Sequence, residues 1–158
     1  MGEGVEWGLH CCMNLAMLGP AMAVPTVRLA GFHELPVAYL NKQMQALARA
    51  GIVTSVPGRG GGFKLARDPS KITLMDVVVA IEGTESAFRC TEIRARGPAG
   101  SWGTVHAACT IDAAMRQADV AWRRALAEQT LADIVAAAQR RYPAMRDRVT
   151  AWFTTAAV

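Results

Sequence analysis

The strongest constraint on the fold is a glycine-rich segment at residues 57–62, which reads Pro-Gly-Arg-Gly-Gly-Gly. It separates a β-branched run at residues 52–56 from a second short β-prone run at residues 63–65. Glycines between two such runs predict a β-hairpin. Arg59 then places a positive charge at the tip of that hairpin.

The residues before the hairpin predict three helices. Apolar residues recur every three to four positions over residues 5–18, and Gly19-Pro20 ends the pattern. A short helix is expected over residues 25–31 and, after a tight connection, a second from Pro36 to about residue 50. The inner face of that second helix is expected to carry Tyr39, Leu40, Met44 and Leu47. Two short helices, a tight turn and a hairpin make a winged helix-turn-helix, so the predicted fold is mainly α with a small β-hairpin wing.

The second half of the chain predicts further helices after a long loop. Residues 74–81 are expected to be helical with Thr73 as N-cap, and residues 83–107 form a loop. A long helix then covers residues 110–128. Its apolar residues alternate four and three apart, the spacing of a helix–helix seam: Ile111, Met115, Ala118, Trp122 and Ala125.

Thr130 and Asp133 resemble a capping box that opens a further helix to about residue 142, before Pro143. The expected division of the chain is a winged-helix domain at 1–82, a cysteine-containing sensor loop at 83–109, dimerisation helices at 110–142 and a C-terminal segment at 143–158.

Positive charge is concentrated in one stretch of the chain. Residues 28–67 hold six basic residues and one acidic residue, a net charge of +5, whereas the whole chain carries +4. A local basic field favours a polyanion such as double-stranded DNA, although a solvated surface gives the same pattern. Five candidate DNA-binding residues face outward on the second helix: Val37, Asn41, Lys42, Gln45 and Arg49. The other candidates are Arg28, Tyr39, Arg59 and Lys64.

Several classes of protein are excluded or disfavoured. The acidic start lacks the basic region of a secretory signal, and no apolar run reaches the roughly 18 residues that a membrane-spanning helix needs. We therefore expect a cytoplasmic protein without a membrane partner, in which the four cysteines are reduced thiols or ligands. No nucleophile–base motif and no phosphate-binding loop indicates an enzyme.

Several segments together resemble the Rrf-two (Rrf2) family of bacterial winged-helix regulators. These segments are residues 39–43, 47–55, 58, 61–65 and 72–77, and the resemblance runs from about residue 5 to residue 109. It implies a homodimer that pairs through the long helix and binds DNA half-sites about one helical turn apart. Two departures concern the operator: Pro36 and Val37 stand where many members have Ser or Thr, and Pro57 stands where many have Arg.

The cysteines of the loop resemble a two-cysteine, RsrR-like redox-sensing branch of that family. Cys90 and Cys109 are present, but the third cysteine of the usual cluster-binding set is absent. A 2Fe–2S cluster needs four ligands, and nitrogen can replace two thiolates. The resemblance implies that His33 and Glu6 of the other subunit complete the set. His106, three residues before Cys109, is the rival ligand, and His10 and Glu92 are weaker candidates.

Other interpretations stay open. Cys90 and Cys109 could be unpaired thiols or, with His106, a zinc or thiol sensor, and the winged helix could be a protein-interaction module. Cys11 and Cys12 are adjacent on a helix, which favours core packing over ligation. If His33 does bind a metal, its position before Pro36 would connect the state of the cluster to the DNA-reading helix. The signal could be redox state, nitric oxide or iron.

Overall fold

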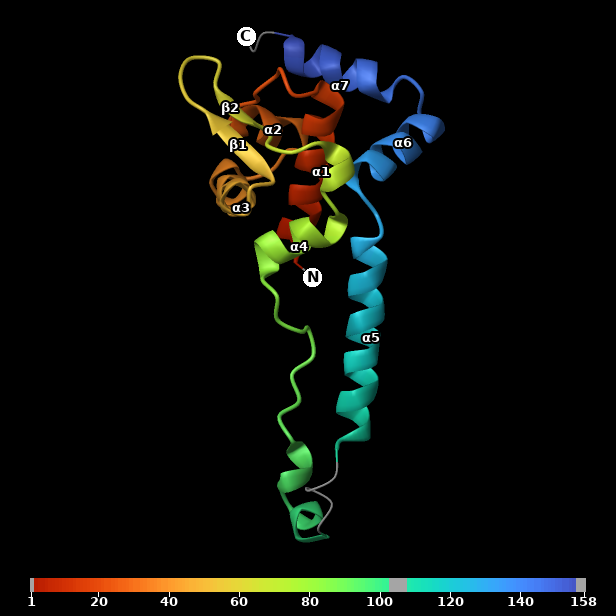
Figure 1. Ribbon diagram of the computed structural model, residues 1–158. Coiled ribbons are helices and arrows are strands. Elements are labelled where there is room, and N and C mark those ends of the chain that lie inside the picture. Colours follow the sequence, from red (N-terminus) through yellow and green to blue (C-terminus); the bar gives the residue numbers. More distant parts are fainter. Residues whose placement is uncertain (1, 103–107, 156–158) are drawn as a thin grey trace.

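The computed structural model of the chain describes residues 2–102 and 108–155. Figure 1 shows a globular body from which one long helix and the segment leading to it project. The predicted fold class, mainly α with a small antiparallel hairpin, is confirmed. The elements are α1 (Glu3–Leu18), α2 (Thr26–Phe32), α3 (Val37–Arg49), β1 (Val53–Val56), β2 (Gly62–Leu65), α4 (Leu74–Glu82), α5 (Thr110–Ala127), α6 (Leu131–Arg141) and α7 (Met145–Thr154). Short 3-10 helices lie at Pro69–Lys71, Ile93–Ala95 and Pro98–Trp102.

Helix α1 forms the centre of the body and packs against α3, α4, α6 and α7. Glycines on α1 allow the close approach of its neighbours. A Cβ atom at Gly8 would lie 2.6 Å from Cδ1 of Ile81, and one at Gly4 would lie 2.9 Å from the amide of Gln43. Cys11 and Cys12 are fully buried in this core, which confirms that they pack there.

The helix-turn-helix is formed by α2 and α3, each preceded by a proline N-cap, Pro25 and Pro36. Their connection bends sharply at Glu34, whose φ is 53°, a left-handed conformation that is uncommon for residues with a side chain. The backbone N–H of Leu35 donates to Ala30 O over 2.9 Å and holds the turn closed. The start of α3 is thus fixed by local chemistry.

The wing is attached to the body by its second strand. β1 and β2 pair antiparallel, and Phe63 of β2 exchanges two backbone hydrogen bonds of 2.8 Å with Val24. Gly62 adopts a φ of 147°, and a Cβ there would lie 2.2 Å from Val24 backbone atoms. Glycine is therefore required at this position, and the wing lies close to the chain entering α2.

Helix α6 belongs to the body, whereas the sequence grouped it with the dimerisation helices. Leu131 N donates to Ile72 O, and Leu74 N donates to Gln129 O, both over 2.9 Å, so the starts of α4 and α6 are joined. Capping boxes fix both starts, at Thr73 with Asp76 and at Thr130 with Asp133. Because the prediction used only the order of helices along the chain, it did not detect that the chain returns to α1 after α5.

Helix α5 differs from every other long helix in the described chain, because none of its 18 residues is buried. It contacts the body through α4 and then runs away from it, as does the segment after α4 (Figure 1). Ile111 and Val120 are 66% and 65% exposed. No helix among the described residues is both long enough and apolar enough to span a membrane.

Candidate functional site

The outward face of α3 is the candidate DNA-reading surface. Leu40, Met44 and Leu47 are fully buried, so the opposite face is fixed toward solvent. Exposed side chains follow one another along it, as the periodicity predicts: Val37, Asn41, Lys42, Gln45 and Arg49. Thr26 at the start of α2 contributes a hydroxyl that donates to Asn41 Oδ1 over 3.4 Å. Amide and cationic groups on one exposed helix face can pair with base edges and phosphates.

Tyr39 differs from its predicted place on the inner face of the helix. Its side chain is 46% exposed and meets Trp7 of α1 edge-on, with ring centroids 5.0 Å apart. The buried polar residue on α3 is instead Gln43, which lies against Gly4. The apolar period alone did not separate these two positions, because Tyr39 precedes the buried Leu40 and lies at the edge of the apolar face.

The wing places Arg59 at an exposed tip between Gly58 and Gly60, whose φ values are 97° and 87°. Lys64 is half-buried on β2, opposite Thr54. Within the described part of the chain, neither cation forms an ion pair, and neither do Lys42 and Arg49 on α3. Their charges remain available for phosphate groups.

Arg28 has a structural role that the sequence did not predict. Its guanidinium donates to Trp152 O over 2.7 Å and to Thr155 O over 2.9 Å. It also lies over the Trp152 ring, 4.5 Å from the centroid. Cations near a helix C-terminus satisfy its free carbonyls. Arg28 therefore caps α7 through Nη2, and this group is directed into the chain instead of toward a DNA partner.

Cys90 and Cys109, near the two ends of the loop, both raise the pKa of the same arginine, Arg94. Cys90 is exposed, and Cys109 is the half-buried N-cap of α5. The pKa of Arg94 is raised, chiefly by its hydrogen bond with Glu92 and further by the charges of Cys109 and Cys90. Glu92 accepts from Arg94 Nε over 2.6 Å, which fixes the guanidinium.

His33 lies in the turn before α3 and contacts α1. Its Nε2 atom is 2.8 Å from Nδ2 of Asn14, which is only 1% exposed. Burial lowers the pKa of His33, and the neighbouring His10, whose ring centroid is 5.5 Å away, lowers it further. Glu6 is exposed one helical turn before His10, and both line a shallow pocket on α1.

The predicted ligands thus form two separate groups within one chain. Cys90 and Cys109 lie on the projecting arm, which comprises the segment after α4 and helix α5. His33 and Glu6 lie on the body, which comprises α1–α4, the wing, α6 and α7. No group of three or more His, Cys, Asp or Glu side chains within residues 2–102 and 108–155 is arranged to hold a metal ion. Glu92 is paired with Arg94, and the rival ligand His106 lies outside the described residues.

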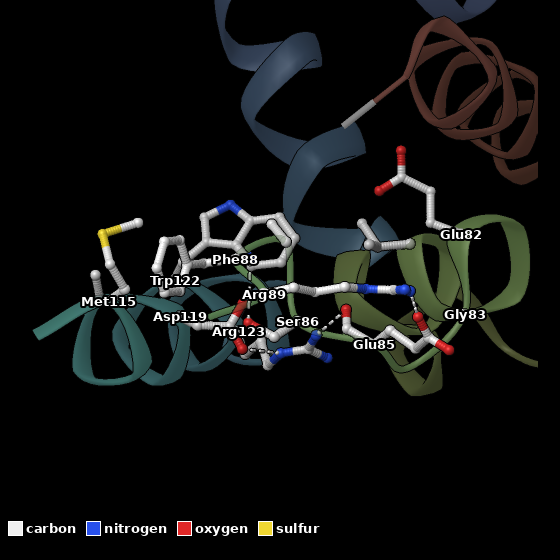
Figure 2. A pocket seen from close by; sticks show the side chains of 13 residues that line it. Glu82, Gly83, Glu85, Ser86, Phe88, Arg89, Met115, Asp119, Trp122 and Arg123 are labelled. Carbon is white, nitrogen blue, oxygen red and sulfur yellow. Dashed lines mark hydrogen bonds and ion pairs between the residues drawn. The ribbon is translucent and has the colours of Figure 1, made fainter. Parts of the chain in front are cut away.

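The seam predicted on α5 borders a cavity of about 680 Å³ between this helix and the segment after α4. Figure 2 shows Phe88, Met115 and Trp122 on one side of it, with Arg123 extended toward Asp119 and Glu85. Arg123 donates to Asp119 Oδ2 and to Glu85 O, each over 2.8 Å. The bond to Glu85 joins the segment after α4 to α5, while Met115 and Ala118 of the apolar seam remain exposed.

The comparisons with known proteins decide the family. The Rrf2 family model, described as an iron-dependent transcriptional regulator, matches residues 1–137. The chain belongs to the Rrf2 family. Protein aau3 of Rhizobium meliloti is 35% identical over 134 residues, which are 82% of this chain and 77% of that protein.

Solved structures of related regulators share the fold of this Rrf2 protein. T. potens IscR superposes with a TM-score of 0.70 at 21% identity, covering 90% of each chain. CymR, the global cysteine regulator of B. subtilis, superposes with a TM-score of 0.66 at 24% identity, covering 86% of this chain and 95% of CymR. Because the relatives are transcriptional regulators, this Rrf2 protein is a DNA-binding transcriptional regulator and not an enzyme.

Two residues that the sequence did not indicate, Asn14 and Arg94, interact with the predicted ligands of this Rrf2 protein. Asn14 contacts His33, and both cysteines raise the pKa of Arg94. The charge of Cys90 also contributes to the raised pKa of Arg116 on α5, whose main cause is the hydrogen bond with Asp112. No local sequence pattern indicates Asn14. The arginines close to Cys90 in the sequence were a usable signal, but the net charge was counted over long segments and did not reveal them.

Proposed function

We propose that this Rrf2 regulator is a homodimer that binds double-stranded DNA through α3 and the wing, and that a redox-sensitive 2Fe–2S cluster sets its affinity. Cys90 and Cys109 of one copy and His33 and Glu6 of the other would be the ligands. The observation that carries the proposal is the separation of these residues into two incomplete groups on the arm and the body. A two-fold dimer can bring such groups together.

The uncovered seam on α5 supports the dimer. Met115 is 40% exposed and Ala118 is exposed, although both lie on the apolar face of the helix. An apolar helix face of this length is stable in water when another surface covers it. Two copies paired along α5 would bury both seams and place two α3 helices on one face of a DNA duplex.

The donor set fits the cluster in its chemistry. Two thiols beside Arg94 are soft ligands in a cationic setting, and an imidazole and a carboxylate are nitrogen and oxygen donors. The cluster, when bound, supplies a one-electron redox change. His33 would transmit its effect, because a displaced imidazole moves the turn at Glu34 and Pro36, from which α3 starts. The two recognition helices would then change their spacing on the half-sites.

The spectrum of the anaerobically purified protein tests the cluster. We expect a red-brown protein containing two iron atoms and two sulfides per chain, and loss of both in Cys90→Ser and in Cys109→Ser. Thr91→Ser, a neighbouring loop substitution, is the matched control and should keep the colour. A colourless protein without iron that still binds DNA would contradict the cluster and leave the DNA-binding proposal intact.

Binding to a fragment of the protein's own promoter tests the DNA surface. Affinity should fall steeply with salt, and Arg59→Ala should weaken binding to every sequence and reduce the salt slope by about 1. Gln45→Ala should instead relax selectivity at one base pair, by about 1–3 kcal/mol. Arg124→Gln, on α5 and outside the DNA-reading surface, should change neither.

A metal-free dithiol sensor is the second candidate function. Cys90 and Cys109 act on the same Arg94 guanidinium although they are far apart in the loop. Their oxidation to a disulfide would release two electrons and two protons to an external oxidant and would tie α5 to the loop. Mass spectrometry of the oxidised, iron-free protein would reveal a Cys90–Cys109 bridge under this alternative.

A further inference from the structure

A second cavity lies on the body, well away from α5, between the α6–α7 connection and the end of α2. Its volume is about 530 Å³, within the range of about 300–1,000 Å³ that is usual for small-molecule sites. Val149 is buried at its base, and Phe32 and Met145 are half-buried on its walls. The residues that line it belong to neither the DNA-reading surface nor the proposed cluster site.

Aromatic rings form much of the wall. Phe32 meets Trp152 edge-on at 5.0 Å between centroids, and it stacks on Phe153 at the same distance with the planes 22° apart. Trp152 and Tyr142 also line the cavity and remain 38% and 58% exposed. Exposed rings held by other rings provide rigid faces and edges for a further aromatic group.

Two arginines complete the lining, and no acidic side chain lines it. Within the described residues, Arg148 has no ion pair and no side-chain hydrogen bond, and Arg141 contacts only the Tyr142 ring, at 5.7 Å. The arginines of α5 differ, because Arg116, Arg123 and Arg124 each pair with a carboxylate one turn away. The cavity thus combines apolar walls with two unpaired guanidinium groups.

We propose that this cavity binds a small aromatic carboxylate. The ring of the ligand would lie against Phe32 and Trp152, and its carboxylate would accept hydrogen bonds from Arg148 and Arg141. A planar guanidinium matches a carboxylate in a two-point contact, which a neutral amide cannot reproduce. The ligand would displace water from exposed aromatic surface and would neutralise positive charge that the chain itself leaves unpaired.

The position of Phe32 gives the site a route to the DNA-reading helix. The Phe32 ring contacts the His33 ring edge-on, with centroids 4.8 Å apart. His33 is followed by the bend at Glu34 and by Pro36, the N-cap of α3. A ligand that shifts Phe32 therefore acts on the same turn as the proposed cluster ligand. This regulatory step rests on the proposed function, whereas binding of the ligand does not.

Calorimetry on the full chain tests the site with benzoate, phenylacetate and indole-3-acetate as probes. We expect at least one of these acids to bind at least about tenfold more tightly than its neutral amide. Arg148→Gln should weaken that binding at least about tenfold. Arg146→Gln is the matched control, because Arg146 lies on the same helix and does not line the cavity, and it should bind as the unmodified protein does. Circular dichroism would verify that both variants fold.

Three results would overturn the binding site: no acid binds at millimolar concentration, the amides bind as well as the acids, or Arg146→Gln weakens binding as much as Arg148→Gln. The regulatory step is measured separately, by anisotropy of a promoter fragment with and without saturating acid. A change of about fivefold or more in DNA affinity supports it. Unchanged affinity with bound acid contradicts the regulatory step alone, and an absence of DNA binding in every condition contradicts the proposed function and leaves the binding site standing.

Discussion

The two longest helices among the described residues, α1 and α5, are similar in length and opposite in environment. Nine of the 16 residues of α1 are buried, whereas none of the 18 residues of α5 is. Both helices carry apolar residues at helical spacing. The difference shows that α1 is covered by its own chain and α5 is not, and the proposed dimer would cover α5 with a second copy. The two pairs of cysteines follow the same division.

Cysteine alkylation is the largest expected contrast between the two regions. Burial raises the pKa of Cys11 to about 12, and burial with the charge of Cys11 raises the pKa of Cys12 still further. At neutral pH, a pKa of about 12 lowers the thiolate fraction on the order of a thousandfold relative to a free cysteine. In the iron-free protein, iodoacetamide should modify Cys90 and Cys109 first, as mass spectrometry would show. Equal labelling of all four cysteines in native buffer would contradict the division, and equal labelling in denaturant is the control.

Leu131→Ala tests whether α6 is part of the body. Leu131 is 1% exposed in the main core, so its truncation should lower the free energy of unfolding by about 3 kcal/mol. Val120→Ala on α5, at a side chain that is 65% exposed and opposite the seam, is the control, and it should change that value by less than about 0.5 kcal/mol. Urea titration at a fixed protein concentration measures both. If Leu131→Ala changed the free energy of unfolding as little as Val120→Ala, the assignment of α6 to the body would be contradicted.

Ala118→Arg tests whether a second copy covers α5. The new charge would lie on the seam, so the dimer should dissociate and affinity for a two-half-site DNA should fall about 100-fold. Because Ala118 is exposed in the single chain, the fold of the body should persist. Analytical ultracentrifugation measures the mass, and Gln117→Arg, exposed beside the seam, should remain dimeric. A monomeric unmodified protein would refute the pairing outright.

The pH dependence of stability sharpens the comparison at His33, where the proposed arm of the partner would meet the body. Its pKa is lowered in the folded chain, chiefly by burial, so the unfolded chain binds this proton more readily. The free energy of unfolding should therefore be highest above about pH 6.5 and should fall as the pH drops below that value. Urea titration of the iron-free protein at pH 7.5, 6.5 and 5.5 measures this slope.

Two variants identify the source of that slope. His33→Gln should flatten it, because it removes the titrating group. His10→Gln should keep most of it, because His10 is the smaller of the two causes. If the slope disappeared in His10→Gln and persisted in His33→Gln, His10 and not His33 would be its source, and the prediction would be contradicted.

Much of the fold was predictable because its signals are local. Pro36 and Gly51 bracket α3, and the pair Thr130 and Asp133 opens α6, each through contacts within a few residues of the sequence. The five residues predicted to face outward on α3 are all exposed, because one buried face fixes the other. The sequence also supplied the proposed ligands, which the family resemblance selected: Cys90, Cys109, His33 and Glu6.

By itself, the sequence determined where helices and strands start and end, the basic character of the reading surface and the family. Tertiary structure alone decided that α6 packs on α1, that Arg28 caps α7 across 124 residues and that Asn14 contacts His33. It also decided that Cys90 and Cys109 both raise the pKa of Arg94. The physical reason is the range of the interactions. Caps, turns and periodic burial act between near neighbours in the chain, whereas an unpaired guanidinium or a buried amide finds its partner only after the whole chain has folded.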